Sequence, residues 1–224
     1  HHRRAWVVMP ENAVKTKIEA VRRNGGEIVF CSPNQQDRER GLAELVEKGC
    51  IPIPPYDHAD IICGQGPAVV ELSVQCPDLD VVLTPVGGGG LISGSAIAAR
   101  ALIPGASVIA AEPEGAADTA LSMQQGERVD SFPVDTIADG LRAIVGVLNF
   151  EIIHDKVDRI ITVSESGIVD AMALVWQHFR LLIEPSSATV VAAILASPEH
   201  FSGRRVGAII SGGNVDLESL PFEP

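Results

Sequence analysis

Short, mainly apolar runs alternate with segments that carry apolar residues at helical spacing, and this alternation restricts the fold more than any other feature. The apolar runs are residues 5–10, 27–31, 80–86, 107–113, 158–164 and 205–213. The segments with helical spacing are residues 13–26, 36–49, 68–76, 91–102, 165–182 and 186–197. Strands that are apolar along their whole length and separated by helices are typical of a parallel sheet covered on both faces. We therefore predict an α/β fold with parallel, twisted sheets and helices on both faces.

A proline-rich stretch, CIPIPPYD (50–57), follows the first two strand–helix pairs. Its composition predicts strand or extended chain and, at its end, a border between two domains. We place this border after residue 58, so that residues 1–58 and 59–224 form separate domains. Residues 113–140 are polar and are expected to be irregular.

The composition excludes two classes of partner. With 17 Lys and Arg against 29 Asp and Glu, the net charge is −12, and we expect no nucleic-acid partner. No run of 18 apolar residues is present, so we expect no membrane-spanning helix. The cysteines have no CxxC spacing, which predicts buried thiols in a reducing compartment and hence a cytoplasmic protein. They are Cys31, Cys50, Cys63 and Cys76.

Four consecutive glycines, Gly87–Gly90, lie between an expected strand and an expected helix. Ligands of open α/β sheets bind at this carboxyl end of a strand, and the helix that follows presents unpaired N–H groups. The run therefore predicts a phosphate cradle, in which a side chain at Gly88 would place its Cβ against the phosphate. The pattern is neither GxGxxG nor GxxxxGK[ST]. The alternative is a tight structural turn without a ligand.

A second glycine-containing motif, Ser211-Gly212-Gly213-Asn214, ends the last apolar run. The hydroxyl of Ser211 can donate a hydrogen bond to a heterocycle nitrogen, or accept one from it, without imposing a charge. The alternative is a simple cap between strand and turn.

The motifs GQGP, PVGGGG, IEPSSA and SGGN resemble, in this order, those of the fold-type II pyridoxal-phosphate enzymes. The resemblance is to the branch of serine racemase and the serine/threonine dehydratases, and it extends over essentially the whole chain. It implies that residues 1–58 form the later part of the small domain. Residues 59–224 would form the large, cofactor-binding domain without its N-terminal elements. It also implies pyridoxal 5'-phosphate as cofactor, an amino acid as substrate and a homodimer.

The resemblance assigns roles to residues of the matching motifs. The backbone amides of the glycine run would hold the cofactor phosphate, and Ser211 would face the pyridine nitrogen. Glu184, in IEPSS, would lie near the ring, although a helix-start carboxylate before a proline is the alternative. Gly140, in ADG, would line the site. The implied cofactor-binding set is Gly87, Gly88, Gly89, Gly90, Gly140, Glu184 and Ser211.

The motif AAEPEGAAD resembles the segment that holds a divalent cation in this branch. The implied ligands are the carboxylates of Glu112 and Asp118 and the main-chain carbonyl of Ala116. Hard oxygen ligands suit Mg²⁺, Mn²⁺ or Ca²⁺. The alternative is that Glu112 only ends a strand and Asp118 only caps a helix.

The family's Schiff-base lysine, in a Ser-x-Lys-x-Arg context, and its Ser-Gly-Asn-His segment have no counterpart here. None of the lysines (Lys15, Lys17, Lys48 and Lys156) has these surroundings, so no catalytic residue is identified and we expect the lysine-bearing part to lie outside this sequence. The implied activity is β-elimination or racemisation of a hydroxy amino acid such as serine, threonine or 3-hydroxyaspartate. The alternative is a fragment, or a non-catalytic relative that binds phosphate or metal without chemistry.

Overall fold

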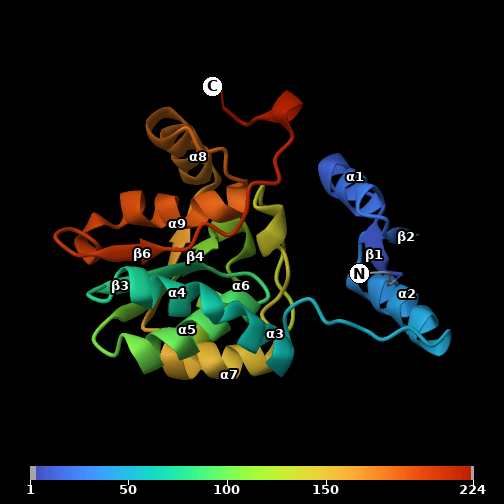
Figure 1. Cartoon of the computed structure of the whole chain (residues 1–224), viewed down its shortest axis with the longest axis horizontal. Helices are drawn as coiled ribbons and strands as arrows, with labels where there is room; N and C mark the ends of the chain where they lie inside the picture. The colour runs from blue at the N-terminus through green and yellow to red at the C-terminus, as the bar shows by residue number, and fades with distance from the viewer. Residues whose placement is uncertain (1–3, 223–224) are drawn as a thin grey trace. The chain divides into compact units, whose positions relative to one another are not determined.

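The computed structural model describes residues 4–222, which divide into two units (Figure 1). Unit 1 contains the residues up to Ile53 together with Asn214–Leu220, and unit 2 contains Pro54–Gly213 and the residues from Pro221 on. The assignment of residues 1–58 and 59–224 to the small and large domains of the family remains a prediction.

Unit 1 contains a two-stranded parallel sheet with two helices. Strands β1 (Trp6–Pro10) and β2 (Glu27–Cys31) pair in parallel, with Trp6 opposite Glu27. Helix α1 (Lys15–Arg23) connects them, and α2 (Gln35–Glu47) follows β2. All four elements were predicted. The asparagine–glycine run after Arg23 ends α1, and Gly25 within it has φ +75°. Pro10 is the last residue of β1, and the Glu11 amide after it still donates to the Cys31 carbonyl at 3.0 Å.

Unit 2 is built on a four-stranded parallel sheet in the order β5-β4-β3-β6. The strands are β3 (Val81–Pro85), β4 (Ser107–Pro113), β5 (Arg159–Val163) and β6 (Val206–Ala208). Every residue of β3 is buried. Strand β6 is shorter than the predicted run 205–213. The amide of Ile209 still donates to the carbonyl of Leu83 at 2.9 Å, but the next bond would need an N–H group on Pro85, which proline lacks.

Helices pack on both faces of this sheet, as predicted (Figure 1). Helix α9 (Pro185–Ala196) packs on β3, β4 and β5, and α8 (Glu165–Phe179) packs against α9. On the other side, α5 (Gly90–Leu102) packs against β3 and β4 and is flanked by further helices. These are α3 (Ala59–Gln65), α4 (Pro67–Gln75) and α7 (Val147–Lys156). The apolar core on this side includes Val82, Ile92, Val108 and Ile153.

Three helices had no counterpart among the predicted elements: α3, α7 and α6 (Asp118–Gln125). Helix α6 lies in residues 113–140, which were wrongly expected to be irregular; it is short and polar, and Gly126 ends it with φ +76°. Short 3₁₀ turns are η1 (Glu114–Ala116), η2 (Asp139–Leu141), η3 (Pro198–His200) and η4 (Leu217–Ser219). Residues 50–57 form no strand. None of the helices within residues 4–222 is long and apolar enough to cross a membrane.

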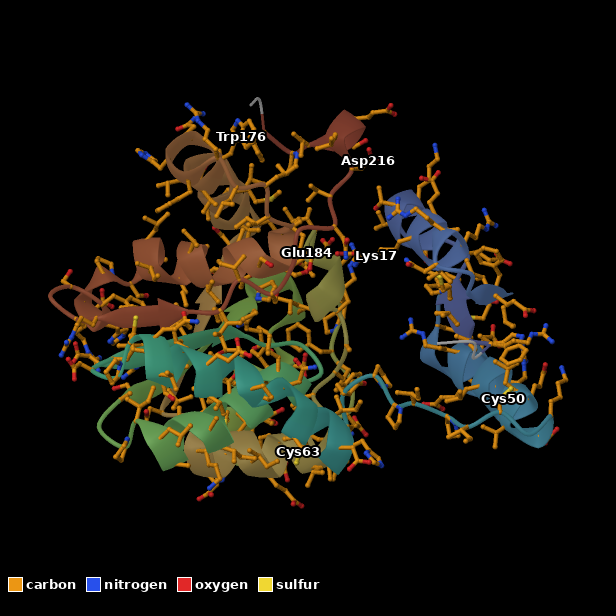
Figure 2. All side chains as sticks on the ribbon, viewed as in Figure 1. Lys17, Cys50, Cys63, Trp176, Glu184 and Asp216 are labelled. Atoms are coloured by element: carbon orange, nitrogen blue, oxygen red, sulfur yellow. The ribbon has the colours of Figure 1, made fainter. Side chains whose placement is uncertain are left out.

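The prediction of buried thiols is wrong. All four cysteines are free thiols in the structure. However, Cys63 on α3 is exposed and Cys50 is partly exposed; both are labelled in Figure 2. Cys76 after α4 is also exposed, and Cys31 is partly exposed. The apolar spacing of these segments does not fix which face of a short helix turns to solvent.

Candidate cofactor site

Strand β3 leads directly into the glycine run at the carboxyl edge of the sheet. All four glycines are buried, Gly89 has φ +95°, and Gly90 begins α5. Positive φ is accessible to glycine at little cost. A Cβ at Gly87 would lie 2.7 Å from Cα of Leu141, and one at Gly89 would lie 2.8 Å from Cβ of Asn149. The backbone is therefore packed closely, with no room for side chains at these positions.

The neighbour of Gly88 differs from the one expected. A Cβ at Gly88 would collide with the ring of Tyr56, so the expectation that it would meet the phosphate is wrong. A Cβ at Gly90 would come within 3.2 Å of Tyr56 as well. The absence of side chains at these two positions thus lets the segment around Tyr56 pack against the loop.

The N–H groups of the loop are its most informative feature. Among the hydrogen bonds of the described residues, none has the amide of Gly87, Gly88, Gly89 or Gly90 as donor. The carbonyls, in contrast, are used: that of Gly89 accepts from Ser93 N at 2.9 Å. Buried N–H groups without an acceptor are unfavourable and rare, and a run of them at a helix N-terminus suits an anion. The loop therefore fits the phosphate group of the family's cofactor.

The SGGN motif is joined to the first turn of α9. The hydroxyl of Ser187 donates to the carbonyl of Gly212 at 2.8 Å and accepts from the Gly212 amide at 2.7 Å. Its oxygen also lies 3.1 Å from Oγ of Ser211. The Glu184 amide, at the N-cap of α9, donates to the Gly212 carbonyl at 3.2 Å. A Cβ on Gly212 would lie 2.6 Å from Oε1 of Glu184, which is labelled in Figure 2.

Gly140 connects the glycine loop with α9. Its amide donates to Oγ of Ser186 at 3.0 Å, and its neighbour Leu141 is the residue against which Gly87 packs. Strands β3 and β6 are adjacent, with Leu83 opposite Ala208, so the segments that follow them leave the same edge of the sheet. The structure thus brings the seven predicted cofactor-binding residues together at this edge.

The two predicted carboxylate ligands lie at the end of β4 and the start of α6. Both are buried: Glu112 is 0% and Asp118 1% exposed. The Glu112 carboxylate accepts from Thr119 N at 3.0 Å and from Ala120 N at 2.8 Å, and Asp118 Oδ2 accepts from Val145 N at 2.8 Å. Ala116 lies between them in η1 and is also buried.

Burial raises the pKa of both carboxyl groups. The pKa of Glu112 is raised to about 8: burial is the main cause and the nearby charge of Asp118 a smaller one, while hydrogen bonds from Thr119 and Ala120 act in the opposite direction. Burial raises the pKa of Asp118 to about 6. Removing two carboxylates from water is unfavourable unless a positive charge lies close, which a cation would supply. No group of three His, Cys, Asp or Glu side chains within residues 4–222 is arranged to hold a metal, but the predicted set contains only two such side chains and a carbonyl.

Four residues that contact the site were not predicted from the sequence. Tyr56 and Asn149 contact the glycine loop, and Ser186 and Ser187 contact Gly140 and Ser211. The serines lie in IEPSS, the motif that also contains Glu184. Asn149 offers a weak signal, because it is a polar residue in the otherwise apolar stretch VLNF.

Two cavities and one lysine among residues 4–222 can be compared with this site. Two cavities of about 320 and 360 Å³ lie in unit 1, and neither is lined by a predicted site residue. Lys156, the one lysine in the sequence of unit 2, ends α7 and pairs with Asp155 at 2.9 Å. It lies roughly 10 Å further along the helix axis than Asn149, which touches the loop.

Comparisons with known proteins agree with this geometry. A family profile described as "Pyridoxal-phosphate dependent enzyme" matches residues 2–212. The chain is 44% identical over 217 residues to a beta-hydroxyaspartate dehydratase of Paracoccus denitrificans, covering 96% of this chain and 69% of that protein. It is 45% identical over 222 residues to a serine racemase of Dictyostelium discoideum, covering 97% and 68%. The chain thus spans about two thirds of the length of these relatives.

Solved structures show the same relationship. The crystal structure of the Dictyostelium discoideum serine racemase superposes with a TM-score of 0.87 at 45% identity, over 96% of this chain and 70% of that one. The structure of maize serine racemase superposes with a TM-score of 0.92 at 39% identity, over 96% and 67%. The predicted fold class and family resemblance are therefore confirmed. The chain belongs to the family of pyridoxal-phosphate dependent enzymes.

Proposed function

We propose that this protein is a pyridoxal-phosphate dependent enzyme that dehydrates or racemises a hydroxy amino acid such as serine, threonine or 3-hydroxyaspartate. The observation that carries the proposal is the run of four buried glycine amides without an acceptor at the carboxyl edge of β3. The activities named for the relatives, hydroxyaspartate dehydratase and serine racemase, support the substrate class.

Each site residue has a role in this proposal. The amides of Gly87–Gly90 bind the phosphate, and Gly140 and Glu184 line the site beside it. Pyridoxal phosphate supplies an electron-withdrawing ring that stabilises charge developing at the α-carbon of the substrate. Ser211 presents a neutral hydroxyl to the ring nitrogen and so leaves it without a charged partner. This arrangement suits elimination, in which a leaving group departs promptly, better than chemistry that needs a long-lived carbanion.

We also propose a divalent cation, Mg²⁺, Mn²⁺ or Ca²⁺, held by Glu112, Asp118 and the carbonyl of Ala116. The complete burial of the two carboxylates supports it. The site is coupled to the glycine loop through two successive amides: Val145 N donates to Asp118, and Gly146 N donates to the Gly88 carbonyl at 3.0 Å. A cation that holds Asp118 in place would therefore also help to hold the loop.

The homodimer and the cytoplasmic location remain proposals that rest on the family resemblance and on the cysteine content. Light scattering on the purified protein measures the first directly. A mass equal to one chain would contradict the dimer.

The experiment that tests the function uses the intact protein. We expect it to purify with an absorption band near the visible range that borohydride abolishes. Because none of the four lysines of this sequence has the family's Schiff-base context, this band requires that the intact protein supplies the lysine from outside this sequence. With serine the protein should form pyruvate and ammonia, and with 3-hydroxyaspartate oxaloacetate and ammonia, or it should invert the substrate. A protein that retains phosphate or metal but shows neither the band nor turnover is the non-catalytic relative instead.

A further inference from the structure

Asn149 lies in the first turn of α7 and is 0% exposed. Its Nδ2 donates to the Gly88 carbonyl at 2.8 Å and to the Tyr56 carbonyl at 3.3 Å. Both neighbours are carbonyl oxygens, which can only accept, so the NH₂ group must face them. The Oδ1 atom is buried and has no hydrogen-bond partner among the described residues. The hydrogen bonds from Nδ2 to the two carbonyls thus fix the orientation of the side chain, although Oδ1 is left without a hydrogen bond.

The Gly88 carbonyl is held from two directions, by Asn149 Nδ2 at 2.8 Å and by Gly146 N at 3.0 Å. The structure contains no cis peptide bond in its described part, and in a trans peptide the C=O and the following N–H point in opposite directions. Fixing the Gly88 carbonyl toward α7 therefore directs the Gly89 N–H away from α7. That amide is one of the four buried donors without an acceptor.

The position of Asn149 is itself fixed by Asp57. The Asp57 carboxylate accepts from Val147 N at 3.0 Å, from Leu148 N at 3.1 Å and from Asn149 N at 3.3 Å. Three hydrogen bonds from successive amides hold the first turn of α7 rigidly against the segment that also carries Tyr56.

We propose that Asn149 is a positioning residue that aims the Gly89 amide at the phosphate of the bound cofactor. The proposal rests on the proposed function, because it needs a phosphate at the glycine loop. It predicts an effect confined to the phosphate end of the ligand. An effect on folding alone would not discriminate between pyridoxal phosphate and pyridoxal, which lacks the phosphate.

Asn149→Leu separates positioning from stability. Leucine has nearly the same size and removes both hydrogen bonds, but it also removes the unpartnered Oδ1 atom, so the folded state loses little. The Gly88 carbonyl keeps its bond from Gly146 N in this variant. Asn149→Asp instead places an acceptor against two carbonyls. Phe150→Leu, in the core beside it on α7, is the matched control, because it perturbs the same helix without touching the loop's hydrogen bonds.

The experiment measures the binding of pyridoxal phosphate and of pyridoxal to the intact protein after cofactor removal, together with the rise in melting temperature caused by inorganic phosphate. For Asn149→Leu we expect pyridoxal phosphate to bind about tenfold more weakly, with pyridoxal binding within twofold of wild type and the inorganic phosphate response diminished. Asn149→Asp should weaken the binding of pyridoxal phosphate further. Phe150→Leu should lower the melting temperature without changing the ratio of the affinities for pyridoxal phosphate and pyridoxal.

Two results would overturn the proposal, and they can be told apart. Equal weakening of both ligands, or no weakening, in Asn149→Leu would remove the positioning role and leave the proposed function intact. A wild-type protein that binds pyridoxal phosphate no more tightly than pyridoxal, and does not respond to inorganic phosphate, would overturn the proposed function as well.

Discussion

The hydroxyl oxygens of Ser187 and Ser211 lie 3.1 Å apart, where the first turn of α9 meets the segment that follows β6. Ser187 also bonds to both backbone groups of Gly212, the next residue. Since a hydroxyl has one hydrogen, Ser187 gives it either to the Gly212 carbonyl or to Ser211. In each arrangement Ser187 holds the backbone that presents Ser211.

The first prediction concerns this pair. Ser211→Ala should weaken cofactor binding and lower kcat/KM by about tenfold, because one hydrogen bond of roughly 1.4 kcal/mol to the ring is lost. Ser187→Ala should instead lower the free energy of unfolding by about 1–2 kcal/mol and affect activity less. Cofactor titration and thermal unfolding measure the two effects, with the exposed Ser202→Ala as control. The assignment of Ser211 would be wrong if both alanine variants behaved alike.

The parts of this site that the sequence predicts are those that follow strands. Gly87–Gly90 and Ser211 each follow an apolar run, and parallel strands send their carboxyl ends to one edge, so their proximity could be inferred before the structure was known. The strands of unit 1 and the helices α1, α2, α5, α8 and α9 were identified by the same spacing rules. The positions of Gly140 and Glu184 needed the family motifs, because nothing in their local spacing indicates a site.

The contacts that fix the glycine loop could not be predicted in this way. Asn149 reaches Gly88 across 61 positions of sequence, on a helix whose mixture of polar and apolar residues gave no clear period. Tyr56 lies in a proline-rich stretch whose composition indicates only a domain border. Tertiary contacts of this kind leave no local pattern, since each residue type is common at the surface as well.

A second prediction concerns Asp57. Asp57→Ala should lower the free energy of unfolding by about 1–2 kcal/mol, because three amides at the start of α7 lose their acceptor and the helix dipole loses its anion. For a protein of this size the melting temperature should fall by roughly 2–4 °C for each kcal/mol. Asp60→Ala, on an exposed side chain, is the control and should change little. An unchanged melting temperature for Asp57→Ala would show that water replaces the carboxylate without loss.

A third prediction tests why residue 88 is glycine. Gly88→Ala places a methyl group into the ring of Tyr56 and should destabilise the protein by about 1–3 kcal/mol. If the ring is the obstacle, Tyr56→Ala in the same chain should recover part of that loss, and a double-mutant cycle should give a coupling energy of about 0.5 kcal/mol or more. Gly105→Ala is the control, because nothing lies within 4 Å of its Cβ. If the losses of unfolding free energy of the two variants, measured by chemical denaturation, are strictly additive, the Tyr56 ring is not what excludes a side chain at residue 88.

The last prediction is a pH dependence with a defined sign. Glu112 has a pKa of about 8 in the folded protein against 4.5 as its ordinary value, and Asp118 about 6 against 3.8. The folded state therefore binds protons that the unfolded state has released, so without metal the free energy of unfolding should decrease as the pH rises from about 4 through 8.

A divalent cation binds the ionised carboxylates, and its binding should release protons and strengthen with pH. We expect Mg²⁺ to raise the melting temperature more at pH 8.5 than at pH 5.5, and a chelator to reverse this. Asp118→Asn should remove the Mg²⁺ response and the contribution of Asp118 to the slope, which lies between about pH 4 and 6, while the contribution of Glu112 between about pH 4.5 and 8 remains. A metal-free protein whose stability is flat between pH 5 and 8, with no response to Mg²⁺, Mn²⁺ or Ca²⁺, would exclude the cation site, because two buried carboxyl groups that ionise without loss need no counter-ion.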